Sequence, residues 1–313
     1  MKEPPGGARI LDADKLYDPG RLATPGTFHR MIQFRRGAAA LLLLASIAPS
    51  PASAQPAAAG AASRWHLDGA TDRCVLTREL RGAGGAATFV LRTIPGSRQY
   101  DLILAGEGLA RPFGRRATEA RVSFGGDTGV HVAPAAALEM PGGRGSGVIL
   151  SRLPERFISE FAAGSTLHLM DKDGAALGSW PIPIGAKAAQ ALSFCETEKQ
   201  VEWGADRAAL AAGATPPRPT TDPKTWVTVR DFGLATSSAP ARFSAVVRMV
   251  VDEKGVPSDC KLIESAGNAE IAPTFCRAVR QSARYEPARD PAGKPVRSVA
   301  VHVLTFEVSV QFD

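Results

Sequence analysis

The sequence predicts an α+β fold in two domains, and three observations carry this prediction. Residues 63–197 contain short alternating apolar runs punctuated by Gly, Pro and Asp, with two short helices among them. Residues 223–313 contain strand, strand, helix and strand in that order. A Pro-rich stretch separates the two, and a chain of 313 residues is long enough for two ordinary cores. We therefore expect a mostly antiparallel β domain followed by a smaller β-β-α-β domain.

The first domain is predicted from its period-two runs, which are typical of antiparallel strands. These runs are "ATFVLRTI", "YDLILAG", "ARVSFGG", "TLHLMD" and "GSWPIPI". A helix is expected over "LPERFISEFAAG", because Phe157 and Phe161 recur at four-residue spacing. A second helix covers "AAQALSFCE" and ends near Cys195. The "DKDG" at 171–174 resembles the start of a calcium loop but lacks its later ligands, so a hairpin turn is expected there.

Residues 198–222 are predicted to be a helix followed by a linker, because Ala-rich sequence gives way to "GATPPRPTTDPK". Beyond it, Phe243–Asp252 and "PSDCKLIES" are predicted to pair as strands around a turn at Glu253–Gly255. A helix is expected from Ala269 to Arg284 and a closing strand from Val296 to Phe312. A helix laid on a three-stranded sheet lets each element bury one face.

The N-terminal region is typical of a secretory signal peptide over residues 31–54. Arg35 and Arg36 form its basic region, an apolar run follows, and Ala52-Ser53-Ala54 predicts cleavage near Ala54. The apolar run is about a dozen residues, whereas a membrane-spanning helix needs about 20. We therefore expect a periplasmic protein, with a retained inner-membrane anchor as the alternative. Residues 1–30 are interpreted as a non-native extension, with Met31 as the true start.

The chain has four cysteines, and export to an oxidising compartment favours disulfides. Three connectivities are possible. Cys260 and Cys276 bracket one compact segment, while Cys74 and Cys195 lie near the two ends of the first domain, so we predict the pairs 74–195 and 260–276. The spacing lacks Cys-x-x-Cys and paired histidines, which argues against zinc, and no cofactor is expected.

The second domain resembles the C-terminal domain of TonB-family proteins over residues 222–312. The resemblance rests on motifs that follow one another in the family's order. They are Asp252, Gly255, Ser265-Ala266-Gly267, Tyr285-Glu286-Pro287-Ala288 and Gly293-Lys294-Pro295-Val296. "WVTVRDFG" at 226–233 and the cysteines 260 and 276 are similar to a disulfide-bearing version found in secreted alphaproteobacterial members. Ala266, Ala272 and Gly233 depart from the family's pattern of Ser, Asp and Pro.

The resemblance implies a partner and a binding mode. Family members bind the short TonB box of an outer-membrane receptor by adding it as a strand beside their sheet. Carried over, the docking edge is Val299 to Phe306, with Val299, Val301, Val303 and Thr305 as partner-binding residues. The function expected is therefore that of a periplasmic adaptor for an outer-membrane receptor or another envelope partner.

The alternative is a TonB-type energy transducer for transmembrane transport, which would retain the N-terminal apolar segment as its anchor. A transducer also needs a long spacer, whereas the linker here has about ten residues and spans at most about 35 Å. The first domain has a weaker resemblance to envelope proteins of the invasion-associated locus B type, which implies no activity. The oligomeric state stays open.

Other functional classes are disfavoured by composition and pattern. The net charge of +6 is spread without a basic run, which argues against nucleic acid. His168 and His302 lie within alternating strands, and no Gly-x-Ser-x-Gly elbow is present, so we expect no enzyme. Arg277, Arg280 and Arg284 share one helical face, which is either solvated or an anion-binding face for an envelope partner; Arg277 and Arg280 are its candidate contacts.

Overall fold

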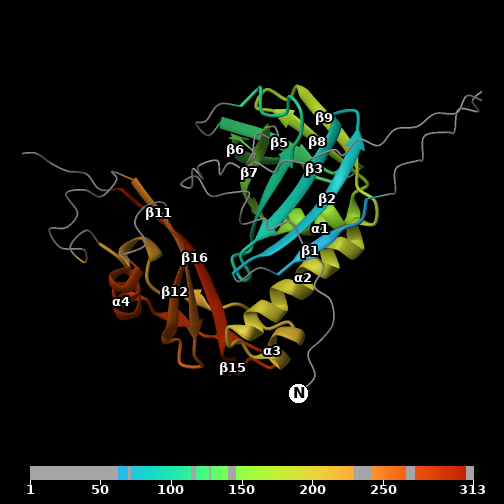
Figure 1. Ribbon diagram of the computed structural model, residues 1–313. Helices are drawn as coiled ribbons and strands as arrows, with labels where there is room; N and C mark the ends of the chain where they lie inside the picture. Colours follow the sequence, from blue (N-terminus) through green and yellow to red (C-terminus); the bar gives the residue numbers. More distant parts are fainter. Residues whose placement is uncertain are drawn as a thin grey trace, which may run out of the picture.

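A computed structural model describes residues 63–69, 72–113, 118–126, 128–139, 146–228, 231, 242–265 and 272–307 (Figure 1). The expected α+β class is wrong, because the chain is mostly antiparallel β, with 46% strand against 22% helix. Most of the strand content belongs to one large curled sheet, which includes more of the first domain than the alternating runs had indicated. The predicted signal peptide and residues 1–30 lie outside the described residues.

The large sheet has nine strands in the order β1-β2-β3-β4-β7-β6-β5-β8-β9. Their bounds are β1 His66–Asp68, β2 Cys74–Gly82, β3 Gly85–Thr93, β4 Gln99–Ala105, β5 Thr118–Ser123, β6 His131–Glu139, β7 Ser146–Pro154, β8 Thr166–Asp171 and β9 Ala176–Pro181. All neighbouring strands are antiparallel. The "DKDG" turn joins β8 to β9, as predicted, with Asp171 Oδ1 accepting from the backbone N–H groups of Asp173 and Ala175.

The sheet curls so that β9 returns against the β2–β3 hairpin. The indole Nε1 of Trp180 donates to the carbonyl of Gly85 at 3.0 Å. A Cβ at Gly82 would lie 2.0 Å from the carbonyl oxygen of Ser179, so only glycine permits this approach. The inward side chains of the curled sheet form one core, in which Phe89, Phe124 and Trp180 are fully buried.

Two helices close this core. Helix α1, Arg156–Ala163, contributes Phe157 and Phe161, both fully buried against Phe124. Helix α2, Gly185–Glu202, packs its Ala188, Leu192 and Cys195 side against the sheet. The prediction that this helix ends near Cys195 is wrong, because it continues for two further turns beyond the disulfide. The sequence after Cys195 is mostly polar, "ETEKQVE", so no apolar periodicity joined it to the helix that precedes it.

The segment predicted as a linker is bonded to the second domain. It contains α3 Arg207–Ala211, β10 Arg218–Pro219 and the 3₁₀ turn η3 Pro223–Thr225. Strand β10 pairs with β13 Tyr285–Glu286, and Thr215 bridges to Arg289. Ala209 packs against Ala288 and Val296. These contacts place the Pro-rich stretch along the surface of the second domain.

The second domain contains a three-stranded antiparallel sheet in the order β12-β11-β16. Its elements are β11 Arg242–Val251, β12 Pro257–Ser265, α4 Ala272–Ser282 and β16 Ser298–Glu307, with β14 Ala288–Arg289 and β15 Pro295–Val296 pairing beside it. The core between sheet and helix includes Val247, Met249, Phe275 and Val279. The closing strand was predicted from Val296 but begins at Ser298, because Arg297 separates it from β15. Residues 308–312 of the predicted strand lie outside the described residues.

Two of the motifs that carry the family resemblance meet in space. The turn glycine Gly255 has φ +79°, and its carbonyl accepts from the N–H of Tyr285 at 3.1 Å. A Cβ on Gly255 would lie 1.9 Å from the carbonyl oxygen of Tyr285. Any other residue at 255 would therefore force the Tyr285–Pro287 segment away from the β11–β12 turn. Ala266 and Gly267 lie outside the described residues.

Both predicted disulfides are present, Cys74–Cys195 and Cys260–Cys276. The first joins the start of β2 to α2, and the second joins β12 to α4. Disulfides are expected of a chain that folds outside the reducing cytoplasm. Among the helices of the described residues, none combines the length and apolar character that a membrane crossing requires.

Removing either disulfide should destabilise the oxidised protein. The Cys260→Ala/Cys276→Ala variant should lower the free energy of unfolding by about 3 kcal/mol, and the Cys74→Ala/Cys195→Ala variant by about 4 to 5 kcal/mol, because the second pair closes a much longer loop in the unfolded chain. Guanidinium unfolding of each variant beside the oxidised wild type measures this. Unchanged midpoints in both variants would show that the crosslinks carry no stability.

Candidate functional site: an open sheet edge

Strand β16 forms one edge of the three-stranded sheet. It pairs with β11 at ten consecutive positions, from Ser298↔Val251 to Glu307↔Arg242, without a register shift. Within the described part of the chain, no strand pairs with its other side. A regular edge of this kind presents a row of backbone N–H and C=O groups to an incoming chain.

Strand β12, at the opposite edge, is irregular. Its pairing with β11 shifts register twice, between Val246 and Val247 and between Arg248 and Val250. Asp259 within it has φ +41°, a left-handed conformation that an Asp side chain tolerates. Bulges and charged residues are the devices by which natural proteins prevent edge pairing. Of the two edges, β16 is therefore the better template for an added strand.

The predicted partner-binding residues lie on β16, with unequal exposure. Val299 is buried, Val301 is half-buried, and Val303 is 42% exposed. Thr305 lies further along the strand, opposite Ser244. Successive residues of a strand face opposite sides, so Val299, Val301 and Val303 share one face of the sheet.

The other face of β16 packs into the domain core. Ala300 and Leu304 are buried there. His302 lies between them, with its ring 4.9 Å from that of Trp226 and 5.8 Å from that of Tyr285. Burial lowers the pKa of His302 to about 4, so the imidazole is neutral at physiological pH. A neutral, aromatic-packed histidine is consistent with a structural role.

The arginines of α4 differ in what they contact. Arg277 and Arg280 are exposed on the side of the helix opposite buried Phe275 and Val279. The guanidinium of Arg284 lies past the helix end and donates to the carbonyls of Ala283, at 2.6 Å, and Gln281, at 3.1 Å. Arg284 therefore acts as a helix C-terminal cap, while Arg277 and Arg280 stay candidates for anion contact.

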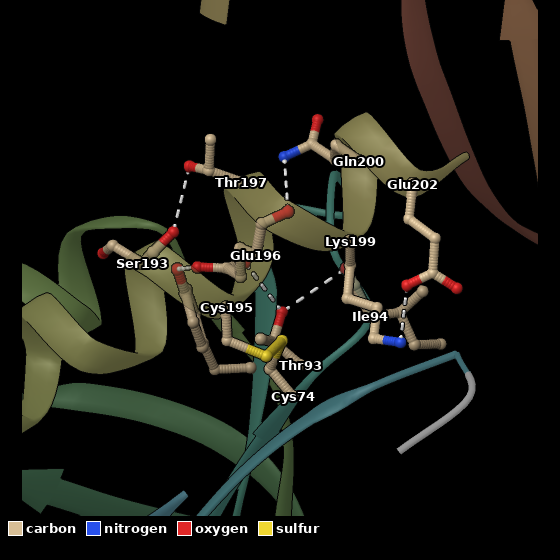
Figure 2. Close-up of a disulfide and its surroundings, with 11 residues drawn as sticks. Cys74, Thr93, Ile94, Ser193, Cys195, Glu196, Thr197, Lys199, Gln200 and Glu202 are labelled. Atoms are coloured by element: carbon tan, nitrogen blue, oxygen red, sulfur yellow. Dashed lines mark hydrogen bonds and ion pairs between the residues drawn. A yellow bond between two sulfur atoms is a disulfide. The ribbon is translucent and has the colours of Figure 1, made fainter. Parts of the chain in front are cut away.

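A partly buried carboxylic acid, which the sequence patterns did not reveal, lies beside the first disulfide. Glu196 follows Cys195 on α2 (Figure 2). The hydroxyl of Tyr100 donates to Oε2 of Glu196 at 3.2 Å. Its Oε1 lies 3.3 Å from the hydroxyl oxygen of Thr93, and Thr93 also donates to the carbonyl of Gln99 at 2.9 Å. The carbonyl of Ile94 lies 3.4 Å from the same hydroxyl. Because Thr93 has one hydroxyl proton for three acceptors, a protonated Glu196 satisfies the cluster better than a charged one.

Burial raises the pKa of Glu196 to about 7, partly opposed by the hydrogen bonds from Tyr100 and Thr93 and assisted by the charge of Glu155. Burial, followed by the charge of Glu196, raises the pKa of Tyr100, so that phenol stays protonated. Glu196 looks like any polar helix residue in the sequence, and only the contacts with β3 and β4 explain its burial.

A second polar contact joins a buried histidine of the large sheet to α1. The Nε2 of His131 is 2.7 Å from Oε2 of Glu160, and His131 is 2% exposed with its ring 5.2 Å from that of Phe157. The pair joins β6 to α1, and the carboxylate of Glu160 is 21% exposed. No group of three or more His, Cys, Asp or Glu in the described ranges is arranged to hold a metal ion.

Glu196→Gln should stabilise the protein at alkaline pH. The folded-state pKa is raised from 4.5 to about 7, so the folded state keeps its proton while the unfolded state loses it, and stability falls as pH rises through this range. A neutral amide avoids the penalty, and we expect a gain of about 1 to 3 kcal/mol at pH 8 and little at pH 4. Chemical unfolding at both pH values measures it.

The matched control is Glu198→Gln, two residues along the same helix, where the carboxylate is 37% exposed and ion-paired with Arg207. Its effect should stay within about 1 kcal/mol. Equal pH dependence in wild type and Glu196→Gln would contradict the interpretation of Glu196 as a buried acid.

Comparison of the chain with protein-family models, curated proteins and solved structures found no match. The resemblance of the second domain to the TonB C-terminal family, and the weaker one of the first domain, therefore stay expectations from motifs. Within the described residues, the position of β16 at an edge of its sheet is a geometric observation that stands without either resemblance.

Proposed function

We propose that this protein is an envelope adaptor that binds an extended segment of a partner protein as an added strand on β16. The observation that supports the proposal most directly is the uninterrupted ten-residue pairing of β16 with β11 at an edge of the sheet. Strand addition obtains affinity from main-chain hydrogen bonds and specificity from alternate side chains. The motif resemblance favours an outer-membrane receptor with a TonB-box-like segment as the partner.

The chemistry of the edge favours an apolar segment. The stretch Ser298–Leu304, "SVAVHVL", has no charged residue and no proline, the two residue classes that usually protect an edge. Side chains of an added strand would alternate between the Val301 and Val303 face and the His302 and Leu304 face. Both faces present carbon surface or a neutral imidazole. Apolar side chains on the partner would gain free energy by leaving water there, whereas charged side chains would pay a desolvation cost.

The energy transducer remains the second candidate, and it depends on whether residues 31–54 are retained. Mass spectrometry of the protein purified from a native envelope decides this. An adaptor should begin at Gln55, after cleavage near Ala54. A mature chain that still contains Gly37–Ala48 would instead favour an anchored transducer and would remove the soluble adaptor.

Val303→Lys should weaken binding of a TonB-box peptide from the same organism's receptors by at least about tenfold. An ammonium group on the edge strand opposes pairing, because an added strand would have to desolvate it. The measurement is an NMR titration of the oxidised full chain, which for the wild type should shift amides of Val299–Phe306.

The matched control is Val256→Lys, in the β11–β12 turn, where the side chain is 47% exposed and away from β16. It should leave the affinity unchanged. Charge reversal at Arg277 and Arg280 tests the helix face separately. Absence of shifts at millimolar peptide in the wild type would reject strand addition by this class of segment.

A further inference from the structure

Strand β11 is buried on both of its faces. Ala245, Val247 and Met249 face α4 and belong to the domain core. Val246, Arg248 and Val250 alternate with them on the opposite face, and are only 7%, 6% and 0% exposed. A three-stranded sheet with one helix can cover one face only, so the second face requires another partner.

Residues of the first domain and of the end of α2 contact this second face, which we call the interdomain face. We call the first domain, together with α2 and Trp203, the upstream domain. We define the interdomain face by Val246, Arg248, Val250, Lys261, Glu264, Val299 and Val301. In Figure 1 the nine-stranded sheet and α4 lie on opposite sides of β11, β12 and β16. A Cβ added to Gly96, in the β3–β4 loop, would lie 3.6 Å from Cγ2 of Val301, so this loop lies close to the interdomain face.

At the centre of the interdomain face a buried arginine stacks on a tryptophan. The guanidinium carbon of Arg248 is 4.9 Å from the ring centroid of Trp203, the residue that follows α2. Asp259 Oδ2 lies 3.2 Å from Nη1 of Arg248 and balances its charge. A buried cation over an aromatic face contributes more than an exposed one because less water competes.

Two ion pairs flank this contact, and their charges alternate. Lys261 Nζ lies 2.8 Å from Oδ2 of Asp72, and Arg73 pairs with Glu264. Asp72 is negative and Arg73 positive, and they face the positive Lys261 and the negative Glu264 of β12. A shift of the two surfaces along the strand would bring like charges together. On each side of the contact a disulfide lies next to the charged residues, because Cys74 follows Arg73 and Cys260 precedes Lys261.

We infer that the upstream domain is an intramolecular partner of the three-stranded sheet, docked on the interdomain face by Trp203 and the Asp72–Lys261 and Arg73–Glu264 pairs. This assigns the upstream domain a task, which is to cover an apolar sheet face that would otherwise meet solvent or another copy of the chain. One consequence rests on the proposed function: a partner segment reaches the sheet only in its plane, at β16.

The test is hydrogen exchange with mass spectrometry on the oxidised full chain. The reversed variant carries Asp72→Lys and Arg73→Glu, which places like charges at both pairs. Peptides covering residues 94–98 and 257–265 should exchange at least about fivefold faster than in the wild type, because the docked state becomes less populated. Adding Lys261→Glu and Glu264→Lys restores opposite charges and should return the rates to within about twofold of the wild type.

Two controls separate docking from general destabilisation. Residues 166–181 of β8 and β9, which make no contact described for the interdomain face, should exchange at the wild-type rate in every variant. Lys172→Glu, a charge reversal in the exposed β8–β9 turn, should change neither region. If a variant fails to fold, wild-type exchange in 1 M NaCl supplies the same test, because salt screens partly exposed pairs.

Reversal without faster exchange, or a four-site variant that stays as fast as the reversed one, would overturn the inference. So would wild-type exchange at residues 94–98 and 257–265 that salt leaves unchanged. The outcome for strand addition is separate. If exchange behaves as expected while the wild type binds no TonB-box peptide, the domain cover stands and the proposed partner class falls.

Discussion

The burial of β11 on both faces is the constraint on which the rest of the structure depends. A strand with apolar residues at successive positions presents apolar side chains on both faces. All of them are removed from water only if both faces of the strand are covered by other elements. Helix α4 supplies the layer on one side, and the upstream domain lies on the other through Trp203 and residues 72–73. With both faces of β11 covered, an added strand can reach this sheet only at an edge, and of the two edge strands β16 is the one with regular pairing.

The strands, helices and disulfides were largely predictable from the sequence, whereas the fold class and the contact between the two domains were not. Alternation located β8, β9, β11 and β12, and the cysteine positions indicated both disulfides, because these signals act over short stretches or follow from the small number of pairings. The α+β class failed because β6 and β7, in Ala- and Gly-rich sequence, carry weak alternation, yet they join the large sheet. The run "FSAVVRMVVD" showed apolar residues at adjacent positions, but sequence alone did not indicate which element covers the second face.

The candidate site shows the same division. The edge position of β16 followed from the resemblance, and the exposed Arg277 and Arg280 from helical spacing. The partial burial of Glu196 and the stack on Arg248 depend on residues far away in the chain, Tyr100 and Trp203. Tertiary contacts of this kind decide whether a polar side chain is solvated, and a single sequence carries no local record of them.

The length of the loop closed by Cys74 and Cys195, 121 residues, has a consequence for the order in which the chain acquires its structure. Synthesis proceeds from the N-terminus, so the nine-stranded sheet and α2 are complete before β11 exists. The surface that covers the second face of β11 therefore precedes β11 in the chain, while α4 and β16 follow it. If the upstream domain folds first, β11 meets a surface that buries its second face, and its apolar residues are exposed to other chains for a shorter time.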